Sequence, residues 1–332
     1  MKTLLKKWAS WTAACALGLG AASFAAPTFA ADAAANYPSK PITMVVGFPP
    51  GGATDVLARI VADHLGQALG QPVVVKNEPG ASSNIASDFV VRSAPDGHTL
   101  LISTIANATN MSVYKDMRYD TQKDLVHIIK LMASPSILVV NSEFPANNLQ
   151  ELLELAKKNP GKYSYASSGV GGSPHLAGEM LELRTGVELL HVPYKGATPA
   201  LQDVLGGTVD MGFKTSLGVM PHLESGRLKP IAIASPERLP DLPNIPTMEE
   251  AGLPDFHVLS WNGISAPAGT PPAIIEKLNK EVNIILKKPE VQEKLRALGA
   301  QPGGGTPEEY SEFISAEIQK WGEVVREADV QL

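Results

Sequence analysis

Residues 42–102 alternate between two hydrophobic patterns. Short continuous apolar runs at 42–46, 72–76 and 99–102 are typical of strands that are buried on both faces. Between them, apolar residues recur with the period of a helix at 56–65, and Ile85, Phe89 and Val90 are expected on one face of a second helix. Strands that alternate with helices in this way predict a parallel sheet covered on both sides.

The same succession of patterns returns after residue 160. The predicted strands of this part are 162–166, 188–192, 209–213, 230–234 and 261–266, and the predicted helices are 175–184, 200–205, 273–286, 289–298 and 307–328. The proline-rich stretch 236–254 has neither period, which predicts an ordered loop. The chain of 332 residues is long enough for two domains, and we expect two α/β domains of one architecture.

The turn after the first strand has the composition of an anion-binding turn. Segment 48–55 reads FPPGGATD, with two glycines between a strand and a helix. Backbone N–H groups can converge there at the positive end of the helix dipole, which suits a carboxylate or a phosphate. Thr54 can cap the helix, and Asp55 interacts favourably with the dipole. The same sequence is also compatible with a capped strand-to-helix turn that binds nothing.

A second turn of this kind, SSGVGGSPH at 167–175, adds hydroxyl groups as donors. Gly169 and Gly171 fit a dinucleotide fingerprint, but Pro174 stands where its third glycine belongs, and the next strand does not end in an acidic residue. A phosphate-binding P-loop is excluded because no Gly-Lys-Ser/Thr follows. Two matched anion turns on two α/β units indicate that one ligand is held from both sides.

Two further turns and one lysine complete the expected site. The turns lie around Asn77 and Tyr194, at the carboxyl ends of their strands, where open α/β sheets bind ligands. Lys214 follows the predicted strand 209–213 and is either the partner of a second carboxylate or a solvated loop lysine. The candidate ligand-binding residues are Phe48, Pro50, Gly51, Gly52, Ala53, Thr54, Ser82, Ser83, Asn84, Ser167, Ser168, Gly169, Gly172, Ser173, Lys195, Gly196, Thr198 and Lys214.

Catalytic motifs are missing from the sequence. Its seven histidines form no His-Glu-x-x-His motif and no close pair, and no Gly-x-Ser-x-Gly motif is present. We therefore expect no metal, no other cofactor and no catalysis. His175 is expected to pack or hydrogen-bond at the start of its helix. Trp261 is equally compatible with the core and with the wall of a cleft.

The first thirty residues have the pattern of a secretory signal. Lys2, Lys6 and Lys7 form a basic region, an apolar alanine-rich stretch follows to about residue 26, and Ala30 with Thr28 fits a cleavage site. The alternatives are an uncleaved membrane anchor and a lipoprotein modified at its single cysteine, near the middle of the stretch. We expect export to the periplasm, with cleavage near Ala30.

Cleavage there would leave an acidic, cysteine-free chain. The segment removed carries three lysines and no acidic residue, so the formal net charge changes from −6 to −9. An acidic chain argues against a nucleic-acid partner but not against an anionic ligand, because local donors determine a cleft. Without Cys15, a disulfide, a thiolate metal site and a cysteine nucleophile are all excluded. No later segment is apolar enough to span a membrane.

An ordered set of short motifs resembles the Bug-type substrate-binding proteins of tripartite tricarboxylate transporters. The motifs are PPGGATD at 49–55 with AR at 58–59, NEPGA at 77–81, APDG at 94–97, HVPYKG at 191–196, LGG at 205–207, IPT at 245–247 with EAG at 250–252, and APAGTP at 266–271. Each motif alone is weak, but together they run in order from residue 37 to about residue 321.

The resemblance implies an α/β, two-lobed periplasmic-binding-protein fold (type II-like) that closes over its ligand. Lobe 1 would comprise residues 37–137 and 263–332, and lobe 2 residues 138–262, with crossings near 135–141 and 260–266. In such proteins the two glycine turns, which fall here on 48–54 and 167–173, hold a carboxylate largely through backbone amides and ordered waters.

It also implies a function. The chain would be a monomeric periplasmic protein that captures a small carboxylate, either a dicarboxylate or an aromatic carboxylate, for the membrane subunits of a transporter. The alternatives are signalling to a sensor kinase and a periplasmic enzyme acting on a carboxylate. Two positions depart from the family pattern: Ser82 and Ser83 stand where glycines are more usual, and Lys214 where a neutral or acidic residue is expected.

Overall fold

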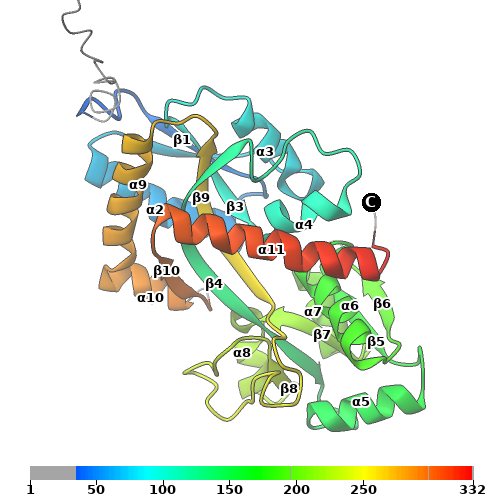
Figure 1. Ribbon diagram of the computed structural model, residues 1–332. Helices are drawn as coiled ribbons and strands as arrows, with labels where there is room; N and C mark the ends of the chain where they lie inside the picture. Colours follow the sequence, from blue (N-terminus) through cyan, green and yellow to red (C-terminus); the bar gives the residue numbers. More distant parts are fainter. Residues whose placement is uncertain (1–34, 195, 298, 331–332) are drawn as a thin grey trace, which may run out of the picture.

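The computed structural model describes residues 35–194, 196–297 and 299–330. The predicted signal segment and Lys195 lie outside these residues. Within them, ten strands form a sheet system that extends through both halves of the molecule, with helices on its faces (Figure 1). Its main path runs in the order β2-β1-β3-β9-β4-β7-β5-β6, and β8 and β10 pair with β4 outside this path.

The first half has a parallel sheet at its edge, as the continuous apolar runs predicted. β1 (Ile42–Val46) pairs in parallel with β2 (Val73–Asn77) and with β3 (Thr99–Thr104), and β9 (Leu259–Pro267) joins β3 in the antiparallel direction. The remaining elements of this half are α2 (Ala53–Leu69), η1 (Ala81–Ser83), α3 (Asn84–Val91), α4 (Ile105–Val113), α9 (Pro272–Leu286), α10 (Pro289–Ala297) and β10 (Gln301–Gly304).

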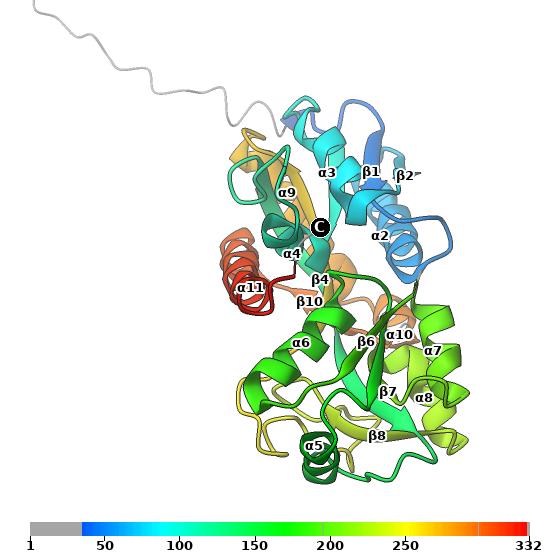
Figure 2. The same cartoon turned by 90° about the vertical axis from the view of Figure 1, so that its right-hand side faces the viewer.

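The second half repeats the arrangement with its own parallel strands. β5 (Ser164–Ser167) pairs in parallel with β6 (Leu190–Pro193) and with β7 (Met211–Thr215). Its other elements are α5 (Leu149–Lys158), α6 (Ser173–Thr185), α7 (Ala197–Leu205), α8 (Ser216–Glu224) and β8 (Leu228–Ile233). Figure 2 shows α5–α8 in this half and α2, α3 and α9 in the other. The two halves therefore each provide helices that begin at the carboxyl ends of parallel strands.

One long strand and one long helix join the halves. β4 (Leu125–Asn141) pairs with β9 and β10 in its first part and with β7 and β8 in its second part. α11 (Pro307–Glu327) packs against α4, β4 and α6 across the junction (Figure 1). The buried carboxylate of Glu317 accepts hydrogen bonds of 3.0 Å from the indoles of Trp261 and Trp321. One cluster of the core thus contains residues from both halves.

Several local predictions were wrong. The apolar face expected on α3 is partly exposed, because Ile85 and Phe89 point outward with 51 % and 40 % of their surface accessible while Val90 is buried. Thr54 does not cap α2, since the N-cap is Gly52 without a side-chain hydrogen bond. Lys214 lies inside β7 rather than after it, because the pairing of β7 with β4 continues to residue 215.

Candidate functional site

Residues from both halves line a cavity of about 300 Å³. None of its lining residues carries a charged side chain, so it offers only hydroxyl, amide and backbone groups to a ligand, with aromatic rings beside them. The lining residues are Phe48, Thr54, Ser82, Thr104, Ile105, Ala106, Thr109, Ser168, Gly169, Val170, Gly171, Gly172, Ser173, Pro174, Ser260, Trp261 and Asn262.

Three helices begin at this cavity. α2 and α6 have glycine N-caps, Gly52 and Gly172, which are extended (φ −76° and −74°) and provide no side-chain cap. The first N–H groups of these helices have no intrahelical acceptor, and a glycine N-cap has no side-chain oxygen that could accept a hydrogen bond from them. The third helix, α4, is capped by the hydroxyl of Thr104. The positive dipole ends of α2 and α6, with their free donors, make the cavity suited to an anion.

A buried carboxylate fixes the first glycine turn. Asp55 Oδ2 accepts a hydrogen bond from the backbone N–H of Gly51 at 2.9 Å, and both carboxylate oxygens accept from Arg59, four residues later on α2. The amide of Asn77 donates to Asp55 Oδ1 and to the carbonyl of Phe48. The hydrogen bond from Arg59 is the main cause that lowers the pKa of Asp55 to about 2. The carboxylate is therefore ionised, and both of its oxygens already accept hydrogen bonds from the protein. It stabilises the turn and does not bind a ligand.

A histidine fixes the second glycine turn, as the sequence predicted for His175. Its Nδ1 accepts a hydrogen bond from the N–H of Gly171 at 3.1 Å, which leaves the proton on Nε2, 3.2 Å from the carboxylate of Glu179. The hydroxyl of Tyr165 donates to the same carboxylate at 2.7 Å. Burial acts to raise the pKa of Glu179, but the hydrogen bonds from His175 and Tyr165 keep it below its ordinary value. The turn thus rests on a chain of polar contacts.

A second histidine stacks on the first. The ring centroids of His175 and His191 lie 4.0 Å apart, and the ring of Tyr165 also stacks on His191, with a centroid distance of 4.9 Å. Burial, followed by the proximity of His175, lowers the pKa of His191 to about 4. The neutral imidazole shares a hydrogen bond of 2.7 Å with the hydroxyl of Ser167, at the start of the turn. The stacked rings therefore support the turn at two points, because His191 is bonded to Ser167 and His175 to Gly171.

The structure brings together part of the expected site. Seven of the candidates line the cavity: Phe48, Thr54, Ser82, Ser168, Gly169, Gly172 and Ser173. Their neighbours Pro50, Gly51, Gly52, Ala53 and Ser167 belong to the same two turns without lining it. Gly196 and Thr198 lie at the start of α7, which begins three residues earlier than predicted, and they do not line the cavity. Ser83 is buried behind its wall, and Asn84 contributes to a different cavity.

Lys214 is buried below the second turn. Only 7 % of the residue's surface is exposed, and its ammonium group donates a hydrogen bond to the carbonyl of Ala166 at 3.2 Å. The side chain extends back along β7, because a Cβ built on Gly212 would lie 3.3 Å from the Lys214 Nζ. Burial lowers the pKa of Lys214 to about 8. It is a buried cation beside β5, the strand that leads into the second turn, and it does not line the cavity.

Sequence reasoning missed the wall supplied by α4 and most of that supplied by β9; Trp261, which was left open between core and cleft wall, is buried and also lines the cavity. Thr104, Ile105, Ala106 and Thr109 come from the β3–α4 junction, and Ser260 to Asn262 come from β9. The start of α4 could have been predicted from the sequence, because Thr104 and Asn107 form a capping box directly after an apolar strand. The sequence predicted a strand at 261–266, but not its place at the cavity, since that depends on pairing with β3 and β4 more than 100 residues away.

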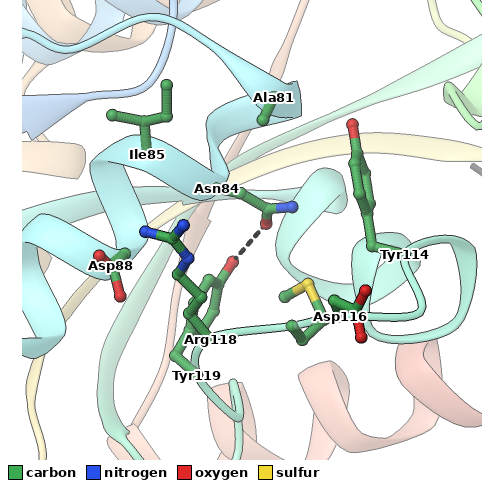
Figure 3. Close-up of a pocket in the computed structure, with 9 residues that line it drawn as sticks. Ala81, Asn84, Ile85, Asp88, Tyr114, Asp116, Arg118 and Tyr119 are labelled. Atoms are coloured by element: carbon green, nitrogen blue, oxygen red, sulfur yellow. Dashed lines mark hydrogen bonds between the residues drawn. The ribbon is translucent and has the colours of Figure 1, made fainter.

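A second cavity, of about 400 Å³, lies on the first half behind the segment 81–84. Figure 3 shows Ala81, Asn84 and Ile85 on one side of it and Tyr114 and Tyr119 on the other, with a hydrogen bond between Tyr119 and Asn84. Residues 81–84 therefore separate this cavity from the one between the halves, whose wall includes Ser82.

Two general features of the described residues bear on function. No helix among them is long and apolar enough to cross a membrane. Within the same residues, no group of three or more histidine, cysteine, aspartate or glutamate side chains is arranged to hold a metal ion.

The fold and the cavity define the class of protein, a two-lobed α/β solute-binding protein. The chain belongs to the tripartite tricarboxylate transporter receptor family, whose model matches residues 57–330. It is 40 % identical over 316 residues to the protein BugT of Bordetella pertussis, which covers 95 % of this chain and 96 % of BugT. This is a family of periplasmic transport receptors and not of enzymes.

Solved structures agree with the fold. The chain is similar to R. palustris Rpa4515 with adipate (37 % identity, TM-score 0.79, covering 89 % of this chain and all of that one) and to the periplasmic binding protein BugD (37 %, 0.75, 89 % and 100 %). It is also similar to MatC from Rhodopseudomonas palustris with bound malate, with 32 % identity and a TM-score of 0.75; the match covers 87 % of this chain and 100 % of that one. The two-lobed fold predicted from the motifs is confirmed.

Proposed function

We propose that the chain captures a small dicarboxylate in the periplasm and delivers it, as a monomer, to the membrane subunits of a tripartite transporter. Export would depend on the segment 1–30, with cleavage near Ala30. The observation that carries the proposal is the cavity itself: two uncapped helix N-termini and several hydroxyl groups converge on it without a charged side chain. Neutral donors at helix N-termini favour an anion over a cation or a neutral solute.

The choice of a dicarboxylate has two supports. Adipate and malate, the ligands of two similar proteins, are both dicarboxylates. In this chain, Lys214 is a buried cation bonded to Ala166 on β5, the strand that leads into the second turn, and only one of its three ammonium protons has a partner among the described residues. A turn of its side chain toward the cavity would give a second carboxylate a charged donor.

A ligand panel tests the function. The protein purified from the periplasm is denatured and refolded to remove bound solute, and its thermal unfolding is followed with succinate, malate, adipate, butyrate, benzoate and an amino acid. We expect dicarboxylates to raise the melting temperature, because a ligand that binds only the native state stabilises it. A rise with benzoate alone would replace the dicarboxylate by an aromatic acid, and calorimetry that detects no heat with any acid would refute the proposal.

Substitution of Lys214 tests the second carboxylate. We expect Lys214→Met to weaken dicarboxylate binding by about 1–3 kcal/mol, the scale of a charged hydrogen bond, and to leave butyrate binding unchanged. Lys229→Met is the matched control, because this lysine also donates to a backbone carbonyl, that of Phe144, away from the cavity. Isothermal titration gives both affinities. An equal loss for the two ligand classes would count against the assignment.

The same lysine predicts a dependence on pH. Because the pKa of Lys214 is about 8 in the folded protein and ordinarily 10.5, the unfolded chain binds more protons between these values. The stability of the ligand-free protein should therefore rise with pH across this window, while dicarboxylate affinity falls as the ammonium loses its proton. In Lys214→Met both trends should be smaller, as urea titrations and calorimetry at pH 7 and 9.5 would show.

A further inference from the structure

Three successive residues, of which the middle one, Ser82, lines the cavity between the halves, have a left-handed backbone. The φ angles of Ala81, Ser82 and Ser83 are 45°, 49° and 72°. Residues with a Cβ rarely adopt this conformation even singly, because Cβ approaches the following carbonyl oxygen. A run of three is retained only where the surrounding structure enforces it, and such strain gathers at ligand-binding and active sites.

Side chains from two neighbouring segments enforce the strained turn. The amide of Asn110 on α4 donates to the carbonyl of Ser82 at 2.8 Å and to Asn84 Oδ1 at 2.9 Å. The hydroxyl of Tyr119 donates to the same oxygen of Asn84 at 2.9 Å, as Figure 3 shows. The turn is therefore held from the side of the second cavity, while its other side faces the cavity between the halves.

The turn also buries a polar group that has no partner. Ser83 is 1 % exposed, and its hydroxyl oxygen makes no hydrogen bond within the described residues. The hydroxyl lies against Gly47, where a Cβ would come within 1.9 Å of it, so the glycine makes room for the serine. A buried hydroxyl without a partner is destabilising, since it has lost its hydrogen bonds to water. Neither the strain nor the hydroxyl is explained by packing alone.

The position of this hydroxyl relates it to the ligand. Gly47 immediately precedes Phe48, and Ser82 immediately precedes Ser83; both Phe48 and Ser82 line the cavity. Ser83 thus adjoins two segments of the cavity wall, the one that contains Phe48 through its contact with Gly47 and the one that contains Ser82 through the chain itself. We propose that the Ser83 hydroxyl is a specificity-determining donor that gains its partner from a carboxylate oxygen of the bound ligand, after a small rotation of the strained turn.

This inference rests on the proposed function, because a carboxylate is the acceptor that it names. The strain has a role in it: the turn is less stable than its neighbours and can rearrange when the ligand supplies the missing hydrogen bond. A hydroxyl donor is neutral, which agrees with a cavity wall that contains no charged side chain.

The test is Ser83→Ala, which removes the hydroxyl and retains the Cβ. We expect the affinity for the best-bound of succinate, malate and adipate to fall about tenfold, the effect of one hydrogen bond to a charged group. The melting temperature without ligand should stay the same or rise, because the unpartnered hydroxyl is gone. Ser83→Gly should show the same loss of affinity with a clearer rise in melting temperature, since glycine adopts a positive φ without strain.

The matched control is Ser87→Ala. The hydroxyl of Ser87 is also buried, but it donates to the carbonyl of Ser83 and accepts from Asn107. Its loss should lower the melting temperature and leave affinity nearly unchanged. Wild-type affinity in Ser83→Ala, or a parallel loss of affinity and stability there, would overturn the inference alone. A wild-type protein that binds no dicarboxylate would overturn the proposed function as well.

Discussion

Replacement of Gly172 by aspartate should abolish ligand binding without harming the fold. Gly172 is extended (φ −74°, ψ 159°), and a Cβ there would meet nothing closer than 3.4 Å, so an aspartate fits the backbone. Its carboxylate would cap α6 and occupy the donors that we assign to the ligand, and aspartate is a better N-cap than glycine by a few tenths of a kcal/mol. We expect a loss of affinity of at least about 100-fold together with an unchanged or higher melting temperature.

Two variants separate the causes of this loss. Gly172→Asn provides a similar cap without the charge and should lose less affinity than Gly172→Asp. Asn148→Asp places a carboxylate at the N-cap of α5, which is not part of the cavity, and should bind ligand normally. Calorimetric titration at pH 7 measures all three. If Gly172→Asp binds a dicarboxylate as tightly as the unchanged protein, the N-terminus of α6 is not the anion site.

Removal of the Asp55 carboxylate should damage both stability and binding. Asp55→Ala leaves the N–H of Gly51 without its acceptor and the guanidinium of Arg59 without its partner, and the first glycine turn then loses its support. We expect a decrease of about 2 kcal/mol in the free energy of unfolding, smaller than for a fully buried pair because the Arg59 side chain is half exposed. Urea unfolding measures the decrease, and ligand affinity should fall with it.

Its control is another aspartate with the same spacing. Asp88→Ala breaks an ion pair with Arg92, also four residues apart, but this pair lies on the exposed surface of α3. Exposed pairs contribute below about 1 kcal/mol, so stability and affinity should change little. Since the pKa of Asp55 is lowered to about 2, its contribution should be complete above pH 3.8 and be lost as the pH falls through 2. Equal effects of the two substitutions would show that the turn does not depend on Asp55.

Local sequence patterns were sufficient for the two glycine turns. Glycines between a buried strand and an apolar helical period define such a turn within about ten residues, and α2 and α6 begin in the predicted turns, with their N-caps at Gly52 and Gly172 and not at the expected Thr54. The hydrogen bond between Gly171 and His175 follows from the same closeness in sequence. What is determined within one strand–turn–helix unit could be predicted from the sequence.

Features determined by distant pairing could not be predicted. Ser260 and Asn262 reach the cavity because β9 pairs with β4, and the residues that predict a strand at 261–266 do not determine that pairing. Lys214 was placed in a loop because its charge ended the apolar run, whereas pairing with β4 extends β7 past it and buries the side chain. Ile85 follows the helical period but faces solvent, since periodicity shows which residues share a face and not what covers it.

The insertion of β9 between β3 and β4 has a consequence for the order in which the molecule can be built. In the register of β3 and β9, Leu101 lies opposite Ser265, so the first sheet lacks its central strand until the chain has been synthesised well past the second half. Contacts between segments so distant in sequence slow folding, because a long loop must close before they form. The half that begins first on the ribosome can therefore be completed only after most of the second half has been synthesised.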